Sequence, residues 1–226
     1  MSHRSKNVLY LLSFAVPGGI VGQNIDEVNR DFYNSSGDSF DKFPFETILP
    51  DLLMKYHKGD EVLEIGSGAG ALAAWLARIG HKVTCIEPAQ KLAERAEAKG
   101  LKVHCLNIQN FHTEHQYDMV IAISSLIHVP KIQLPLQIEK IVTLLKPQGI
   151  FFVNFIEGKT EGFEDPTNAG KMRFFSKWDE KELDLFLSRY FDVLEKHRIY
   201  SKKMDCTFLL RLCQVKVFGK NARRRS

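Results

Sequence analysis

Short apolar runs rich in β-branched residues alternate with helical patterns along the chain after residue 60. This alternation is typical of a parallel sheet that carries helices on both faces. The runs that we expect to form parallel strands are 61–65, 82–86, 102–106, 118–123 and 149–155. Helices are expected to begin near Ala69, Ala89 and Lys131, behind the strands that they connect.

The end of the chain follows a different pattern. A helical segment near 179–190 leads into an apolar run at 191–199, and the polar turn 201–203 separates that run from another at 206–218. Two strands joined by so short a turn must be antiparallel. The pattern therefore predicts an α/β fold with a mostly parallel sheet that finishes in an antiparallel hairpin, unlike the two βαβαβ halves of a dinucleotide-binding domain.

One apolar run carries an acid and then breaks into three alternating glycines, in the sequence VLEIGSGAG at 62–70. Glycine at every second position lets the backbone turn sharply and approach a ligand, because a Cβ there would occupy ligand space. A helical pattern follows directly. This turn predicts a binding site for a nucleotide-like ligand.

Two ligands compete for the turn. Its spacing from Gly66 to Ala71 fits the fingerprint for dinucleotides, and Glu87 stands about where a ribose-binding acid is expected. Glu64, however, lies inside the strand just before the first glycine, where a pyrophosphate would disfavour a negative charge. S-adenosylmethionine carries a sulfonium and an ammonium group, and a nearby acid suits these positive charges. The antiparallel hairpin at the end of the chain is not part of the usual dinucleotide-binding fold. Both features favour S-adenosylmethionine over NAD or a flavin.

Composition and cysteine spacing narrow the class of protein. The chain has 226 residues, 44% of them hydrophobic, and a net charge of +4, which suits one soluble domain. Its four cysteines, at 85, 105, 206 and 213, form no C-x-x-C pair and lie in strand-like segments. We therefore expect buried reduced thiols, a cytoplasmic location and no bound metal.

Four further motifs follow the glycine turn in a fixed order. They are CIEP at 85–88, LNI at 106–108, YDMVIA at 117–122 and LLKPQG at 144–149. With them the chain resembles the class I S-adenosylmethionine-dependent methyltransferases of the small-molecule type, roughly over 32–218. The resemblance implies a Rossmann-like sheet of seven strands and S-adenosyl-L-methionine as the cofactor.

The resemblance also implies the cofactor contacts. They are Glu64, Gly66, Ser67, Gly68, Gly70, Glu87, Pro88, Asn107, Ile108, Ile123 and Ser124. Glu87 is expected to accept both ribose hydroxyls, and Glu64 to orient the ammonium group. Asn107 replaces an aspartate that is usual in the family, but its amide oxygen can still accept a hydrogen bond from the adenine amine.

Methyl transfer from a sulfonium is a direct displacement, so it depends mainly on alignment of the acceptor. A general base matters only if the acceptor must lose a proton, and His128 is the candidate. A structural histidine that fixes the loop is the alternative. Phe32 and Tyr33 are candidates for a lid over the substrate, as is the segment 157–178, and Arg173 is a candidate to hold an anionic substrate or to pair with a nearby acid.

We divide the chain into an N-terminal extension at 1–30, a methyltransferase domain at 31–218 and a basic tail at 219–226. The charged and apolar start of the extension resembles a short targeting signal, but its apolar run is too short to span a bilayer. The short apolar run therefore predicts no stable membrane span. The basic tail is expected to be a solvated end, so a nucleic-acid partner is not expected.

The sequence therefore predicts a methyltransferase that acts on a small molecule with an oxygen, nitrogen or carbon acceptor. Its alternatives are an RNA or protein methyltransferase, supported only by the basic tail, and a non-catalytic module that binds S-adenosylmethionine. The motif N/D-P-P-Y/F, which accompanies methylation of amino groups, is absent at the end of the fourth strand.

Overall fold

The computed structural model describes residues 24–35, 45, 47–56, 59–166 and 170–216. The signal-like start of the chain and the basic tail lie outside these residues. The boundary expected at residue 30 falls inside a helix, α1 (Ile25–Asn34).

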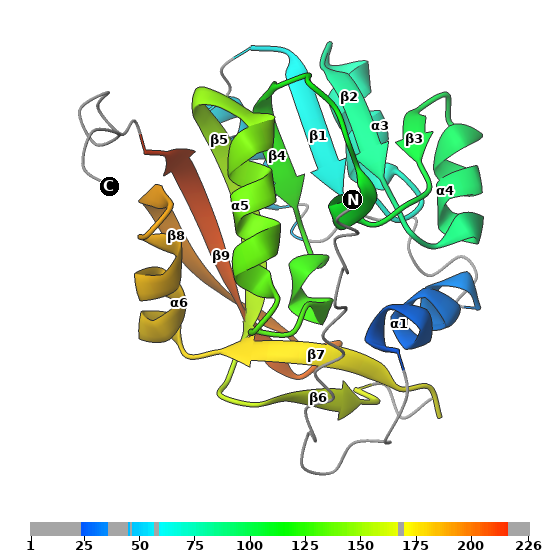
Figure 1. Cartoon of the computed structure of the whole chain (residues 1–226), viewed down its shortest axis with the longest axis vertical. Coiled ribbons are helices and arrows are strands. Elements are labelled where there is room, and N and C mark those ends of the chain that lie inside the picture. The colour runs from blue at the N-terminus through cyan, green and yellow to red at the C-terminus, as the bar shows by residue number, and fades with distance from the viewer. Residues whose placement is uncertain (1–23, 36–44, 46, 57–58, 167–169, 217–226) are drawn as a thin grey trace, which may run out of the picture.

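The main sheet has the strand order β3-β2-β1-β4-β5-β9-β8. Its strands are β1 (Glu61–Ile65), β2 (Lys82–Ile86), β3 (Lys102–His104), β4 (Tyr117–Ala122), β5 (Leu145–Glu157), β8 (Phe191–Ser201) and β9 (Cys206–Val215). The first five pair in parallel, whereas β9 is antiparallel to both β5 and β8. This confirms the mostly parallel, seven-stranded sheet with a terminal antiparallel hairpin (Figure 1).

Helices cover both faces of the sheet because side chains alternate between the faces along each strand. On one face α5 (Leu134–Leu144) and α6 (Glu180–Leu187) pack against a core that includes Leu63, Val120 and Phe151. On the other face α2 (Leu49–Tyr56) and α3 (Ala71–Arg78) pack against the neighbouring positions, such as Val62, Met119 and Phe152. The remaining helix of the sheet region is α4 (Gln90–Glu97), between β2 and β3.

The bounds of several elements differ from those that the sequence predicts. α3 begins at Ala71 instead of Ala69, because Gly70 takes a left-handed conformation with φ 75° at the N-cap. α5 begins at Leu134 instead of Lys131, since a turn precedes it in which the Leu134 N–H donates to the Pro130 carbonyl. β3 ends at His104, which leaves Cys105 exposed. Cys206 is only partly buried, so the expectation of buried thiols holds for Cys85 and Cys213 alone.

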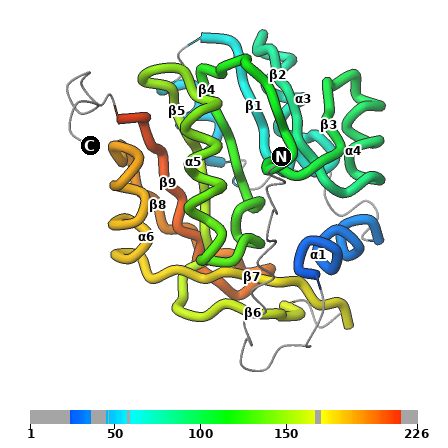
Figure 2. The backbone as a smooth tube through the Cα atoms, viewed as in Figure 1, coloured from blue at the N-terminus to red at the C-terminus, as the bar shows by residue number. Residues whose placement is uncertain are grey.

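The segment after β5 forms a hairpin of β6 (Glu161–Glu164) and β7 (Arg173–Trp178), which joins the seven strands and extends the sheet to nine. The end of β7 pairs in parallel with the end of β5, and the Phe174 N–H donates to the Asn29 side chain of α1 at 2.9 Å. Figures 1 and 2 show α1 and β7 beyond the carboxyl ends of β1 and β4. These two elements therefore close the edge of the sheet at which α/β proteins bind ligands.

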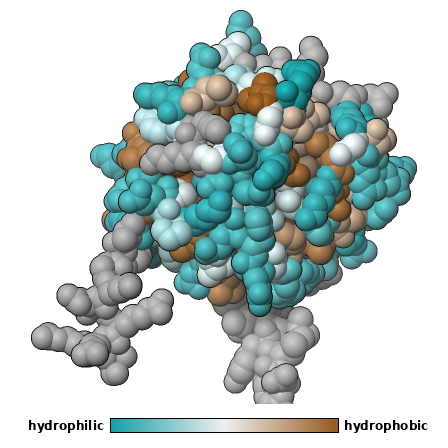
Figure 3. Space-filling view, turned by 90° about the horizontal axis from the view of Figure 1, so that it is seen from above, coloured by the Kyte–Doolittle hydropathy of each residue, from teal (hydrophilic) through white to brown (hydrophobic). Residues whose placement is uncertain are grey.

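Figure 3 shows the face at the end of the molecule away from these two elements. From above, at the opposite end of the molecule, hydrophilic side chains dominate and apolar ones are scattered among them (Figure 3). None of the helices within the described ranges is long and apolar enough to cross a membrane. In the same part of the chain, no three His, Cys, Asp or Glu side chains are grouped so as to hold a metal ion.

Candidate cofactor and acceptor site

A pocket of about 1240 Å³ lies at the carboxyl edge of the parallel strands. The glycine turn after β1, the ends of β2 to β4, α1 and β7 contribute to its walls. All but one of the site residues expected from the sequence line it, namely Phe32, Tyr33, Glu64, Gly66, Ser67, Gly68, Glu87, Pro88, Asn107, Ile108, Ile123, Ser124, His128 and Arg173. The exception is Gly70.

The three glycines of the turn have different surroundings, although all have a positive φ. A Cβ on Gly66 would lie 2.5 Å from the Ser125 side chain, and one on Gly70 would lie 2.5 Å from Leu101 and 2.8 Å from the Cβ of Ala96. A Cβ on Gly68 would meet no atom of the described residues within 4 Å. Only Gly68 therefore combines a place on the pocket wall with open space, while Gly70 permits α3 to approach α4.

This difference predicts that substitution of Gly70 mainly lowers stability, whereas substitution of Gly68 mainly weakens ligand binding. Gly70→Ala should lower the free energy of unfolding by about 2 to 4 kcal/mol, because overpacking adds to the cost of a left-handed alanine. Gly68→Ala should lower it by only about 1 to 2 kcal/mol, yet its methyl group would enter the pocket and weaken ligand binding. Thermal melts and titrations with S-adenosylhomocysteine compare the two variants. Equal stability of Gly70→Ala and the wild type would contradict the packing role.

Glu87 closes the glycine turn from the end of β2. One carboxylate oxygen accepts a hydrogen bond from the Gly68 N–H and the other from the Ala89 N–H, both at 2.8 Å. Burial raises the pKa of Glu87, and these two N–H groups oppose the shift. Each oxygen retains a lone pair that can accept a ribose hydroxyl.

Glu64 is a buried acid whose Oε2 has no hydrogen-bond partner among the described residues. Burial raises its pKa to about 8, with Glu87 adding to the shift and the Ala73 N–H opposing it. The side chain is therefore mostly neutral at pH 7. Since buried polar atoms are nearly always paired in folded proteins, the unpaired oxygen of this pocket-lining acid indicates a place for a cationic ligand group.

α1 reaches the far end of the same pocket, which the sequence analysis missed. The Asn107 side-chain N–H donates to Asp26 of α1 at 3.1 Å, and this leaves the amide oxygen of Asn107 available as an acceptor. Asn24 caps the helix by accepting from the Asp26 N–H. An asparagine followed by two acids is a helix start signal, and it could have identified α1.

The end of β4 is held in a strained conformation. Ser124 has φ 55°, and its N–H donates to the side chain of Asn154 on β5 at 2.5 Å. A left-handed non-glycine residue costs free energy and persists only when its neighbours hold it there. Asn154, which the sequence analysis did not identify, thus fixes the direction in which the chain leaves β4 toward His128.

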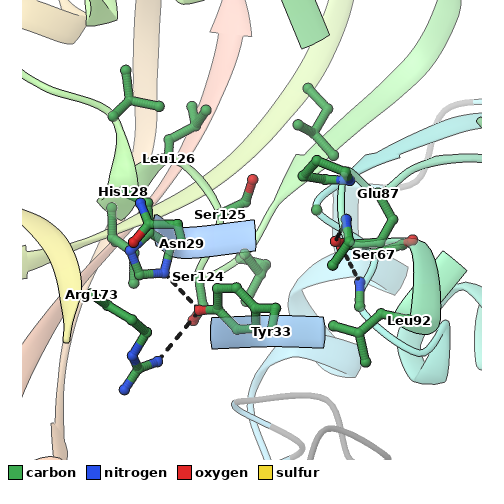
Figure 4. A pocket seen from close by; sticks show the side chains of 18 of the residues that line it. Asn29, Tyr33, Ser67, Glu87, Leu92, Ser124, Ser125, Leu126, His128 and Arg173 are labelled. Atoms are coloured by element: carbon green, nitrogen blue, oxygen red, sulfur yellow. Dashed lines mark hydrogen bonds between the residues drawn. The ribbon is translucent and has the colours of Figure 1, made fainter. Parts of the chain in front are cut away.

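His128 makes a hydrogen bond with each ring nitrogen. Its Nδ1 lies 2.6 Å from the Phe174 carbonyl, and its Nε2 lies 2.7 Å from the Tyr33 hydroxyl (Figure 4). A carbonyl only accepts, so Nδ1 carries the proton and Nε2 accepts from the Tyr33 O–H. Burial lowers the pKa of His128 to about 4, the Phe174 carbonyl opposes this shift, and the charge of Arg173 adds to it. His128 is therefore a neutral base, and it contacts the rest of the site through Tyr33.

Arg173 lies on the other side of the Tyr33 hydroxyl, to which its Nη1 donates at 3.4 Å. Its guanidinium group stacks on the ring of Phe32 at 4.1 Å and faces that of Phe175 at 5.0 Å. In the described part of the chain no carboxylate forms an ion pair with it, so the neighbouring acid considered from the sequence is not seen there.

Comparisons with known proteins support the assignment of the glycine turn to a methyltransferase domain. The profile of a family described as a methyltransferase domain matches residues 62–149. The chain is 27% identical over 147 residues to the ubiquinone biosynthesis O-methyltransferase of Rickettsia canadensis, a match that covers 59% of this chain and 61% of the relative. The chain thus matches less than two thirds of the length of this relative.

Two solved structures share the fold. Magnesium protoporphyrin IX methyltransferase of Synechocystis PCC 6803, with bound S-adenosylmethionine, aligns with a TM-score of 0.66 at 15% identity, over 87% of this chain and 100% of that chain. The N-methyltransferase NodS of Bradyrhizobium japonicum WM9, in complex with S-adenosylhomocysteine, aligns with a TM-score of 0.63 at 17% identity, over 85% and 99% of the two chains.

Proposed function

Because the chain belongs to the class I S-adenosylmethionine-dependent methyltransferases, we propose that it transfers a methyl group from S-adenosylmethionine to a hydroxyl group of a small molecule. The observation that carries the choice of a hydroxyl is the chain of hydrogen bonds from the Phe174 carbonyl through His128 to the Tyr33 hydroxyl. An acceptor that must lose a proton needs such a base, whereas an acceptor with a free lone pair does not.

The residues of the pocket fit this cofactor. Glu87 has acceptors for the ribose hydroxyls, the unpaired Oε2 of Glu64 suits the ammonium group, and Gly68 leaves room for close approach. Asn107 has a free amide oxygen for the adenine amine. The cofactor, when bound, supplies a methyl group on a positively charged sulfur that leaves as a neutral thioether. The pocket volume of about 1240 Å³ exceeds that of most single-ligand sites, which supports a small acceptor beside it.

Tyr33 and His128 act on the proton of the acceptor. As the acceptor oxygen bonds to the methyl carbon, its proton passes to the Tyr33 oxygen while the Tyr33 proton passes to Nε2 of His128. The imidazolium is stabilised by the Phe174 carbonyl, which accepts from Nδ1. His128 would gain its positive charge as the bound cofactor gave up one, so the net charge of the site would not change, and this would limit the cost of charging a buried histidine.

The lowered pKa of His128 predicts an unusual pH dependence. With cofactor and acceptor saturating, the rate should change less than about twofold between pH 7.5 and 5.5, because a base with a pKa of about 4 stays unprotonated over this range. A histidine of ordinary pKa near 6.5 would be about nine-tenths protonated at pH 5.5, and the rate would fall about tenfold. Steady-state rates across this range distinguish the two cases, and a tenfold fall would contradict the neutral, buried state of His128.

The raised pKa of Glu64 predicts that cofactor binding releases a proton. Near pH 7 the acid is mostly protonated in the free protein, and the ammonium group of the ligand would favour its ionised form. Calorimetry with S-adenosylhomocysteine in buffers of different ionisation enthalpy should show release approaching one proton for the wild type. Glu64→Gln should release far less and bind more weakly. Equal proton release by both proteins would exclude Glu64 as the group that titrates.

A screen for S-adenosylhomocysteine formation tests the proposed reaction. Hydroxylated small molecules are compared with their methyl ethers and with amines of similar size. Turnover of hydroxyl compounds, and none of the ethers, is the expected result. Turnover of amines alone would contradict the assignment of a hydroxyl acceptor.

A further inference from the structure

Arg173 is a buried cation with unused hydrogen-bonding capacity. Its side chain is 7% exposed, its Nε has no partner among the described residues, and its Nη1 makes one long hydrogen bond to Tyr33. Removing a guanidinium from water without a counter-ion is costly, so buried arginines are normally paired. Because Arg173 lines the pocket, its incompletely paired guanidinium indicates a negatively charged ligand group.

The aromatic neighbours hold the guanidinium in one plane. Phe32 lies 4.1 Å from it and Phe175 lies 5.0 Å from it, on two different elements. A planar fork with a fixed orientation is suited to bind both oxygens of a carboxylate, and its rigidity reduces the entropy lost on binding. The group is thus prepared for an oxyanion before the ligand arrives.

The charged side chains that line the pocket differ between the glycine turn and the region of Arg173, the acceptor end. The acids Glu64 and Glu87 stand at the glycine turn, at the cofactor end. Lys171, two residues before Arg173, lines the pocket and donates to the Ser35 side chain at 3.0 Å, and Lys203 of the β8–β9 turn lines it as well. Asp26 and Arg30 of α1 line the pocket as well. Lys171 adds positive charge two residues from Arg173, which favours an anion there.

An apolar wall completes the acceptor end. Ile127 and Phe208 belong to one buried cluster with Phe175, and Met204 packs against it. Ile127, Phe208 and Met204 line the pocket. A ligand that fills this region would bury an apolar body against these side chains.

We propose that the methyl acceptor is an organic acid with an apolar body, and that Arg173 binds its carboxylate beside the Tyr33 hydroxyl. This inference rests on the proposed function only in naming the bound acid as the methyl acceptor. Binding of the acid itself follows from the buried guanidinium and the apolar wall.

The test uses matched acids and amides as probes. Benzoate and the three hydroxybenzoate isomers, together with the corresponding amides, are titrated into the full-length protein saturated with S-adenosylhomocysteine. At least one acid should bind ten or more times as tightly as its amide. Arg173→Met should abolish this preference, and Arg173→Lys should retain part of it, because a lysine keeps the charge but lacks the planar fork.

The control is Lys177→Met, which removes a positive charge from the same strand. Lys177 pairs with Glu164 outside the pocket, so the variant should retain the full preference for acids. Thermal melts and the affinity for S-adenosylhomocysteine establish that each variant is folded.

Two results would overturn the proposal: equal binding of acids and amides by the wild type, or a preference that survives in Arg173→Met. Failure of S-adenosylhomocysteine to bind the wild type is a separate outcome. It would contradict the proposed function, and an Arg173-dependent preference for acids in the same protein would still support the anion site.

Discussion

Glu87→Gln is expected to weaken the binding of S-adenosylhomocysteine by about 100-fold. The two oxygens of Glu87 accept from the Gly68 and Ala89 N–H groups, and an amide would turn an NH₂ donor toward one of them. A buried donor left without an acceptor costs about 1 to 3 kcal/mol, and the ribose would lose an acceptor as well. Together these losses approach the 2.7 kcal/mol that corresponds to 100-fold.

Glu94→Gln is the matched control for this variant. Glu94 is an exposed acid on α4 that accepts a hydrogen bond from the Gln90 side chain, and it does not line the pocket. The control should bind S-adenosylhomocysteine as the wild type does. An affinity of Glu87→Gln within threefold of the wild type would contradict the ribose-binding role of Glu87.

Tyr33→Phe is expected to lower kcat by about 100-fold and to leave the affinity for S-adenosylhomocysteine within twofold. The ring that packs against Phe32 and His128 is kept, and only the hydroxyl that links the acceptor to His128 is lost. Loss of general base catalysis typically lowers a rate by about 10² to 10⁴. Steady-state kinetics with an acceptor found in the screen, together with ligand titration, separate the two effects.

His128→Ala should lower kcat to a similar extent, and the double variant should be no slower than the slower single variant. Residues that act as one unit lose their function together, so their effects do not add. Tyr56→Phe is the control, because its hydroxyl donates to Glu195 at 2.6 Å outside the pocket. Full activity of Tyr33→Phe toward a hydroxyl acceptor would show that the Tyr33–His128 pair is structural, the alternative considered from the sequence.

The sequence predicted the parts of the site that are formed by local patterns. β1 and β2 have the predicted bounds, and the glycine turn between β1 and α3 lies where its spacing places it. These features depend on residues close together along the chain, such as an apolar run that ends at a glycine. The same holds for Glu64 and Glu87, whose positions follow from the ends of their strands.

The acceptor end depends on contacts between distant residues. Tyr33 and His128 are 95 positions apart, and Tyr33 and Arg173 are 140 apart. The sequence predicted Phe32, Tyr33 and the segment 157–178 at the site, but not that they form α1 and the β6–β7 hairpin, because their packing is not encoded in a local period. For the same reason spacing could not show that Gly70 faces α4 instead of the ligand.

A titration of the wild-type protein with S-adenosylhomocysteine and, separately, with NAD⁺ tests the central claim most directly. The buried acids at the glycine turn and the antiparallel end of the sheet both favour the methyltransferase cofactor over a dinucleotide. Saturable one-to-one binding of S-adenosylhomocysteine, and no binding of NAD⁺ at the same concentrations, is the predicted result. Binding of NAD⁺ without binding of S-adenosylhomocysteine would contradict it.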